Sequence, residues 1–125
     1  MRFLPIIFFA FLGISCQSQN KTTSSAQSSD TLTQEQIIQQ KIKDGAMLVD
    51  VRTTEEFAEG SVPGAVNIPV DQVEQHLEQF KDKKDIIVFC RSGNRSGKAQ
   101  KILESHGFSN VINGGSWEYV NALLK

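Results

Sequence analysis

The sequence predicts an α/β domain with a central, mainly parallel sheet of about five short strands and helices on both faces. From about residue 31 to the end of the chain, short apolar runs alternate with longer segments of helical period. The run at 86–89 is continuously apolar and contains β-branched residues, which is typical of a strand buried on both faces. The chain has 125 residues, of which 39% are hydrophobic, so it is long enough for one such domain.

The first half of the domain begins with a helix. Thr33 and Gln36 form a capping box, and the helical pattern that follows stops at Gly45. The next expected elements are a strand at 46–51, a short helix at 54–58, a strand at 65–68 and a helix at 70–80. Because the last of these has its apolar residues on one face, we expect it to cover the sheet.

The second half continues from the buried strand with a helix at 96–105, which stops at Gly107. A short strand at 111–112 and a glycine turn at 114–115 come next. The chain ends with a helix whose apolar residues are Trp117, Val120, Leu123 and Leu124.

Three of the predicted strands end at residues that can carry chemistry. Asp50 and Arg52 lie at the end of one strand, Cys90 follows another, and the glycine turn at 114–115 follows a third. Ligand sites in open parallel sheets form beyond the carboxyl ends of the strands. We therefore expect these segments to meet at one rim of the sheet.

Cys90 is the candidate nucleophile. It directly follows an apolar strand, and a glycine-containing loop then opens a helix. The positive charges of Arg91 and Arg95, the loop amides and the positive end of the helix favour the thiolate. The alternative is a small buried residue at a strand end, but apolar burial would raise the thiol pKa and would not require two nearby arginines.

Residues 1–16 resemble a bacterial lipoprotein signal peptide. Arg2 precedes an apolar stretch at 3–14 that is too short to span a membrane but suits a secretory signal. Cys16 stands where such signals are lipidated, although Gly13 replaces the usual leucine. We expect an exported protein that is lipidated at or near Cys16; the alternative is an ordinary cleaved signal in which this cysteine is incidental.

A polar segment separates the signal from the domain. Residues 17–30 consist almost entirely of Ser, Thr, Gln, Asn and Ala, which predicts a flexible linker. The domain at 31–125 would then be tethered to a membrane of the cell envelope and face the periplasm. Two cysteines in an exported chain usually suggest a disulfide, but lipidation of Cys16 would leave Cys90 as a free thiol.

Composition narrows the range of partners. The formal net charge of -1 gives no case for nucleic-acid binding, and the basic run at 81–84 fits a solvated loop. His76 and His106 lie outside the motifs and show no metal-ligand spacing, so we expect neither a metal nor another cofactor. The membrane is expected as a partner only through the lipid anchor, and a monomer is the default expectation.

Four segments within 31–125 resemble the rhodanese sulfurtransferases: 48–57, 60–69, the Cys-x-x-Gly-x-Arg loop at 90–95, and 111–115. Ser61 departs from the family pattern, which commonly has histidine there. Tyr119 stands for the aromatic residue that usually follows the double glycine, and Trp117 is an additional one.

This resemblance implies that Cys90 takes a sulfane sulfur from a donor such as thiosulfate, holds it as a persulfide, and passes it to cyanide or a thiol. Backbone N–H groups of the loop would hold the outer sulfur. Arg91 would attract the anionic donor, while Arg95 would pair with Asp50. Asp50 and Arg52 would support the loop. The expected loop residues are Arg91, Ser92, Gly93, Asn94, Arg95 and Ser96.

Three alternatives remain at the level of sequence. A phosphatase or arsenate reductase also cradles an oxyanion with a cysteine loop, but those loops are one residue longer than the stretch from Cys90 to Arg95. A binding module could use the same rim without catalysis, although such modules usually lack the cysteine. A persulfide carrier or redox relay for a specific periplasmic protein would keep the cysteine but have a different donor.

Overall fold

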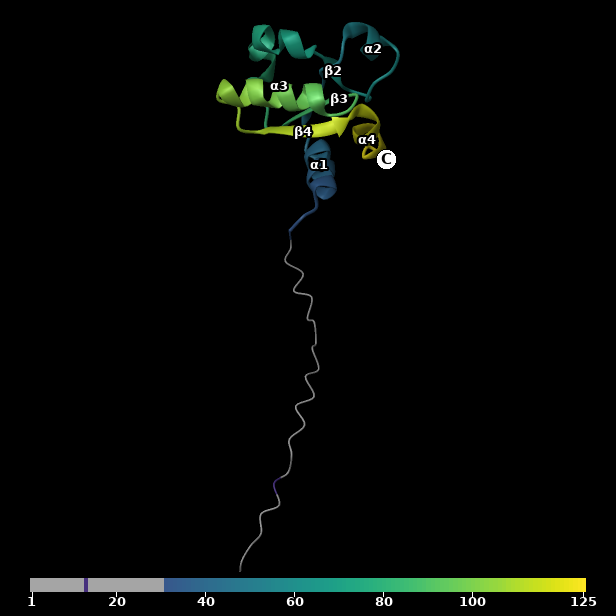
Figure 1. The fold of residues 1–125 in the computed structure, drawn as a ribbon, viewed down its shortest axis with the longest axis vertical. Coiled ribbons are helices and arrows are strands. Elements are labelled where there is room, and N and C mark those ends of the chain that lie inside the picture. The colour runs from purple at the N-terminus through teal and green to yellow at the C-terminus, as the bar shows by residue number, and fades with distance from the viewer. Residues whose placement is uncertain (1–12, 14–30) are drawn as a thin grey trace, which may run out of the picture.

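The computed structural model describes residue 13 and residues 31–125, and its fold is the expected α/β arrangement (Figure 1). Its strands form one sheet in the order β2-β1-β3-β4, and all neighbouring pairs are parallel. The strands are β1 (Met47–Asp50), β2 (Val66–Asn67), β3 (Ile86–Cys90) and β4 (Val111–Ser116). The described sheet thus has four strands rather than about five, because the four apolar runs named from the sequence account for all of them.

The helices are α1 (Gln34–Lys43), α2 (Thr54–Ala58), η1 (Val70–Phe80), α3 (Asn94–Ser105) and α4 (Trp117–Ala122). The predicted capping box of α1 is confirmed, since the Thr33 hydroxyl accepts from the Gln36 N–H and the Gln36 side chain accepts from the Thr33 N–H. Thr53 and Glu56 form a second capping box at the start of α2. These caps satisfy N–H groups that the first turn of a helix leaves unpaired.

Helices cover both faces of the sheet, as predicted. Figure 1 shows α3 on one side of β4 and α1 and α4 on the other. One core cluster packs η1 and α3 against the sheet, and a second packs α1 and α4 against the opposite face. Successive β3 residues alternate between the two clusters, and all five are completely buried. The strand that ends on Cys90 is therefore the centre of the core.

The segment at 70–80 is a 3₁₀ helix with a break, which corrects the expectation of one regular helix. His76 leaves helical geometry at φ -122° and ψ 27°. On either side of it, Val70 and Val73 are three residues apart, as are Leu77 and Phe80. A spacing of three matches the turn of a 3₁₀ helix, so each half can direct its apolar residues at the sheet.

The double glycine lies inside β4, which corrects the expectation of a strand at 111–112 followed by a turn. Asn113 pairs with Val88, but the next β3 residue, Phe89, pairs with Gly115. Gly114 is thus the extra residue of a β-bulge. A Cβ atom on Gly114 would lie 2.8 Å from Val120 Cγ2 and 3.0 Å from an Ile87 methyl, so only glycine fits without displacement.

The predicted signal peptide at 1–16, its Cys16 and the linker at 17–30 lie outside the described residues, apart from Gly13. In the part of the chain that the structure describes, no helix combines the length and apolar character needed to cross a membrane.

Replacing Gly114 with alanine is expected to lower the free energy of unfolding by roughly 1–3 kcal/mol, because the added methyl overpacks the contact between β4 and α4. Urea denaturation of the Gly114→Ala variant measures this loss. In a Val120→Ala background the shortest contact is absent, so the alanine penalty should shrink. An equal penalty in both backgrounds would contradict the steric explanation.

Candidate active site

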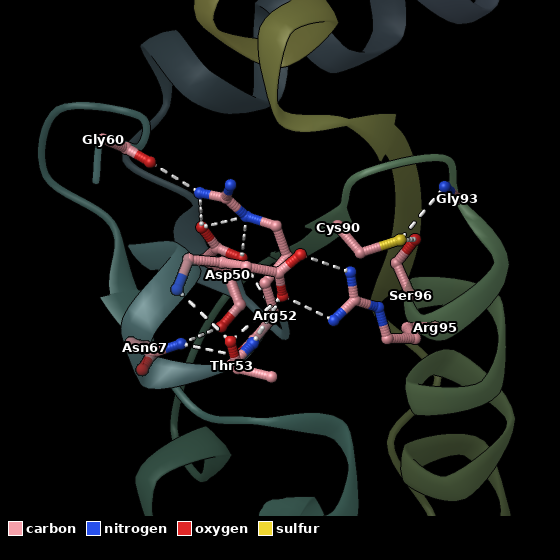
Figure 2. A network of polar contacts seen from close by, with 10 residues as sticks. Asp50, Arg52, Thr53, Gly60, Asn67, Cys90, Gly93, Arg95 and Ser96 are labelled. Atoms are coloured by element: carbon pink, nitrogen blue, oxygen red, sulfur yellow. Dashed lines mark hydrogen bonds and ion pairs between the residues drawn. The ribbon is translucent and has the colours of Figure 1, made fainter. Parts of the chain in front are cut away.

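Cys90 ends β3, and its residue has no solvent-exposed surface. Its Sγ accepts a hydrogen bond from the Gly93 N–H at 3.0 Å and lies 3.4 Å from the Ser96 hydroxyl (Figure 2). Gly93 has a φ of 93°, a left-handed conformation that favours glycine. A Cβ atom there would also lie 3.4 Å from the Gly115 Cα, so the loop packs closely against β4.

The local environment favours the Cys90 thiolate. Burial raises the pKa of the Cys90 thiol, because it removes water from the charged form. Hydrogen bonds from the Ser96 side chain and from the backbone N–H groups of Ser96, Ser92 and Gly93 lower it, and together they outweigh burial. The pKa of Cys90 therefore lies below its ordinary value. Thiolates are the reactive form of cysteine, so this geometry is compatible with a nucleophile.

The loop between β3 and α3 is shorter than predicted, because α3 begins at Asn94 rather than at Ser96. Ser92 and Asn94 are exposed, and Ser96 is completely buried. The Gly97 N–H donates to the Gly93 carbonyl at 2.9 Å, which closes the first turn of α3. The twelve-residue helix α3 therefore begins directly after the cysteine loop, and the positive end of its dipole lies at the loop.

Ser96 and Asn113 connect the loop with β4. The Ser96 hydroxyl donates to Asn113 Oδ1 at 2.7 Å, and Asn113 Nδ2 donates to the Gly93 carbonyl at 3.1 Å. Asn113 Oδ1 also accepts from the Gly115 N–H at 3.0 Å. Asn113 was not among the residues predicted from the sequence. Its position immediately before a double glycine, at the end of a strand near the expected rim, was the available signal.

Arg95 pairs with Glu56, so the predicted ion pair between Arg95 and Asp50 is wrong. Its two terminal nitrogens donate to the two Glu56 carboxylate oxygens at 2.7 and 3.0 Å. The Arg95 guanidinium and the Thr53 N–H hold the pKa of Glu56 at about 2, and the pair raises the pKa of Arg95. Glu56 also belongs to the capping box of α2, so one carboxylate joins α2 to the start of α3.

Asp50 and Arg52 form a separate, buried pair. Arg52 Nη2 donates to the Asp50 carboxylate at 2.7 Å and to the Gly60 carbonyl at 2.6 Å (Figure 2). Ser61, at the position that departs from the family pattern, donates to the same carboxylate at 2.7 Å. The Arg52 guanidinium lies 4.9 Å from the centre of the Trp117 ring, within cation–π range. These contacts hold the chain that follows β1 against the start of α4.

Asn67 strengthens this support from β2. Its side-chain amide donates to the carbonyls of Asp50 and Arg52, both at 3.0 Å. The pKa of Arg52 is raised, chiefly by its hydrogen bond with the Asp50 carboxylate. Because β1 and β3 pair in parallel, their carboxyl ends lie side by side, as predicted. Asp50 at the end of β1 pairs with Arg52, whereas Arg95, which follows the end of β3, pairs with Glu56.

Arg91 is exposed at the entrance of the loop. It lines a hollow of about 180 Å³ together with Arg52 and Trp117, and the carboxylates on its wall are those of Glu56, Glu59 and Glu118. Arg95 lines a second hollow of about 330 Å³ on the side of α2 and η1. Glu56 thus lines the first hollow, and its partner Arg95 lines the second.

The predicted site residues within 31–125 therefore fall into three groups, and the first of these, Arg91, Ser92 and Asn94, is exposed on the loop and the first turn of α3. Cys90, Gly93, Arg95 and Ser96 lie together with Asn113 and Glu56, which the sequence analysis did not select. Asp50 and Arg52 lie beside them and bind each other. Cys16 lies outside the described residues.

Comparison with known proteins gives a consistent family assignment. Residues 33–122 match the family described as Rhodanese-like domain. The thiosulfate sulfurtransferase PspE of Escherichia coli is 38% identical over 69 residues, which cover 54% of this chain and 66% of that protein. The thiosulfate:glutathione sulfurtransferase of Saccharomyces cerevisiae is 32% identical over 108 residues, covering 76% and 77%, respectively.

A solved structure of an Escherichia coli rhodanese with anions superimposes with a TM-score of 0.55 at 32% identity, covering 59% of this chain and 89% of that one. The matching part of this chain covers 36% of the length of one relative, 63% of a second and 77% of a third.

Removing the charge of Glu56 is expected to destabilise the protein by at most about 1 kcal/mol at neutral pH, since the pair with Arg95 is partly exposed. The Glu56→Gln variant keeps an oxygen for the capping box and so isolates the charge. Folding lowers the Glu56 pKa from 4.5 to about 2, so its contribution is complete above pH 4.5 and is lost as the pH falls towards 2.

Urea denaturation at several pH values measures the difference between wild type and Glu56→Gln. Glu59→Gln is the control, because Glu59 is exposed and makes no ion pair within residues 31–125. A difference that stays constant down to pH 2, or one that Glu59→Gln reproduces, would contradict the assigned role of Glu56.

Proposed function

The chain belongs to the rhodanese family, and we propose that it is a sulfurtransferase that carries a sulfane sulfur on Cys90 as a persulfide. The observation that carries this proposal is the environment of Cys90 Sγ, which is buried and faces the Gly93 N–H and the Ser96 hydroxyl. Relatives named as thiosulfate sulfurtransferases support the reaction type.

The proposed reaction has two displacements at sulfur. The Cys90 thiolate attacks the outer sulfur of a donor such as thiosulfate, the sulfur–sulfur bond of the donor breaks, and sulfite leaves with the bonding electron pair. Cyanide or an acceptor thiolate then attacks the outer sulfur of the persulfide. The bond to Cys90 breaks, and the Cys90 thiolate leaves with its electron pair. A covalent intermediate of this kind gives ping-pong kinetics.

The loop is suited to hold the persulfide anion. The outer sulfur carries the negative charge and would lie among the backbone N–H groups of residues 91–96, near the positive end of α3. Fixed dipoles of this kind stabilise charge without reorganising during the reaction. Arg91, exposed at the entrance, would attract the anionic donor.

The arrangement of Arg95 argues against a phosphatase. An oxyanion-binding loop needs donors that point at the anion, but both terminal nitrogens of Arg95 bind the Glu56 carboxylate. An arginine neutralised in this way is a poor ligand for a tetrahedral phosphate. Together with the short loop from Cys90 to Arg95, this pair favours a single sulfur atom as the group that is held.

We also propose that the protein is exported and tethered to the cell envelope by a lipid at or near Cys16. The support is the sequence of residues 1–16, which has a basic start, an apolar stretch and a cysteine, followed by the polar segment at 17–30. The sulfurtransferase domain would then work in the periplasm, close to a membrane surface.

Incubation with thiosulfate is expected to add the mass of one sulfur atom to the purified protein, and cyanide should remove it. Intact-mass measurement tests both steps. Cys90→Ser should never gain the mass, whereas Cys16→Ser, which keeps the nucleophile, should gain it as the wild type does. Gain of sulfur by Cys90→Ser would refute the assigned nucleophile. If wild type accepts sulfur from neither thiosulfate nor a persulfide donor, a binding module becomes the better interpretation.

Replacing Cys16 with serine is expected to move the protein from the membrane fraction to the soluble fraction of a bacterial host, since no acyl chain could then be attached. Cell fractionation followed by detection of the protein measures this change. Cys90→Ser is the matched control and should stay with the membrane. Equal membrane association of the wild type and Cys16→Ser would overturn the proposed lipid anchor.

A further inference from the structure

On the premise that Cys90 carries the transferred sulfur, we propose that Asn113 is a positioning residue for this sulfur. Asn113 holds the Ser96 hydroxyl while the sulfur is uncharged and competes with the thiolate for the hydroxyl hydrogen when the sulfur ionises. Ser96 hydrogen-bonds to Asn113 and lies within hydrogen-bond distance of Cys90, so Asn113 acts on the sulfur through Ser96.

The orientation of the Asn113 amide follows from its neighbours. The Gly93 carbonyl, which can only accept, lies 3.1 Å from one end of the amide, and the Gly115 N–H, which can only donate, lies 3.0 Å from the other. Nδ2 must therefore face Gly93, and Oδ1 must face Gly115. The opposite orientation would place like groups against each other at both ends. Oδ1 is thereby fixed as an acceptor for Ser96 as well.

The Ser96 hydroxyl has one hydrogen and two candidate acceptors. Asn113 Oδ1 lies 2.7 Å away, and Cys90 Sγ lies 3.4 Å away, a usual distance for a hydrogen bond to sulfur. A hydroxyl can donate to only one of them at a time, and its hydrogen rotates to the stronger acceptor. Because Ser96 and Cys90 are both completely buried, bulk water does not take part in this choice.

The two states of the sulfur call for different orientations. A protonated Cys90 can donate its own hydrogen to Ser96 Oγ, so the Ser96 hydrogen then points at Asn113. An ionised Cys90 is the stronger acceptor and draws the hydrogen away. Asn113 Oδ1 keeps the Gly115 N–H as its partner in both states, so no buried group is left unpaired. Ionisation of Cys90 therefore requires the loss of one bond to Asn113.

The β-bulge is what makes this arrangement possible. Asn113 lies opposite Val88, and the extra residue Gly114 shifts the following pairs by one position. The Gly115 N–H is thereby brought to Asn113 Oδ1, and the Gly115 Cα lies where Gly93 approaches it. Gly114 and Gly115 thus allow the loop to approach at Gly93 and fix the Asn113 amide that binds Ser96.

Other charged groups near Cys90 come from three places. Arg95 is on α3 and is paired with Glu56 of α2. Asp50 is the last residue of β1, the strand beside β3, and is paired with Arg52. Within 111–116, β4 has no titratable side chain. Arg91 is exposed on the loop itself. Because none of these groups differs between the variants below, their effects on Cys90 cancel in a double-mutant comparison.

The test measures the pH dependence of Cys90 alkylation by iodoacetamide, which reports the thiolate fraction without requiring sulfur transfer. All proteins are full-length and carry Cys16→Ser, so that Cys90 is the only thiol. Asn113→Ala is compared in the Ser96 and the Ser96→Ala backgrounds. With Ser96 present, removing the competing acceptor should lower the midpoint by about one pH unit, a tenfold change in the ratio of thiolate to thiol. With Ser96→Ala, the same change should have little effect.

Asn113→Asp provides a second test if the alanine variant folds poorly. The carboxylate is a stronger acceptor for the Ser96 hydrogen, so the midpoint should rise more with Ser96 than with Ser96→Ala. The direct repulsion between carboxylate and thiolate is present in both backgrounds and cancels.

Equal shifts in the two backgrounds would overturn the proposal, since they would mean that residue 113 acts on the loop independently of the hydroxyl. An Asn113→Ala midpoint that is unchanged or higher with Ser96 present would overturn it as well. The alkylation result is separate from sulfur uptake. A chain that takes up no sulfur but shows the expected coupling would refute the sulfurtransferase proposal and leave the role of Asn113 intact.

Discussion

The burial of the Cys90 sulfur is the constraint on which the active site depends. A thiolate without solvent-exposed surface loses the stabilisation that water provides, and this loss alone would keep the sulfur protonated. The protein replaces water with hydrogen bonds whose donors are fixed in place, from Gly93 and from Ser96. Within residues 31–125, every fully buried side-chain nitrogen or oxygen has a hydrogen-bond partner, and the Ser96 hydroxyl lies within reach of both Cys90 and Asn113.

Fixing these donors requires two distant segments to approach closely. Gly93 turns the chain with a positive φ, and its Cα region packs against Gly115 of β4. The bulge at Gly114 permits that approach, while the lack of a side chain on Gly114 lets α4 pack on the opposite face. The double glycine therefore contributes to the sulfur site, because a Cβ atom on Gly93 would lie 3.4 Å from the Gly115 Cα and the φ of 81° at Gly115 is one that favours glycine.

The sequence predicted the elements that depend on local pattern, and it failed where partners depend on side-chain direction. A continuous apolar run identified β3 and the position of Cys90, and a capping box located the start of α1. The partner of Arg95 was wrong, because charge alone does not distinguish Asp50 from Glu56. Only the folded chain, which brings the Glu56 carboxylate to the Arg95 guanidinium, makes that choice. The bulge was missed because glycine is a weak strand former, so pairing with β3 decides its conformation.

The separation of the two ion pairs explains why the site can respond to the charge of its sulfur. The Asp50 carboxylate is occupied by Arg52 and Ser61, and the Arg95 guanidinium is occupied by Glu56. Each pair is nearly neutral, and the groups that hydrogen-bond to the sulfur are backbone N–H groups and the Ser96 hydroxyl. A cation in direct contact would stabilise the thiolate more strongly, but it would also reduce its nucleophilicity. Hydrogen-bond donors of moderate strength suit the proposed reaction, in which the sulfur attacks a sulfur donor in one step and leaves from a persulfide in the next.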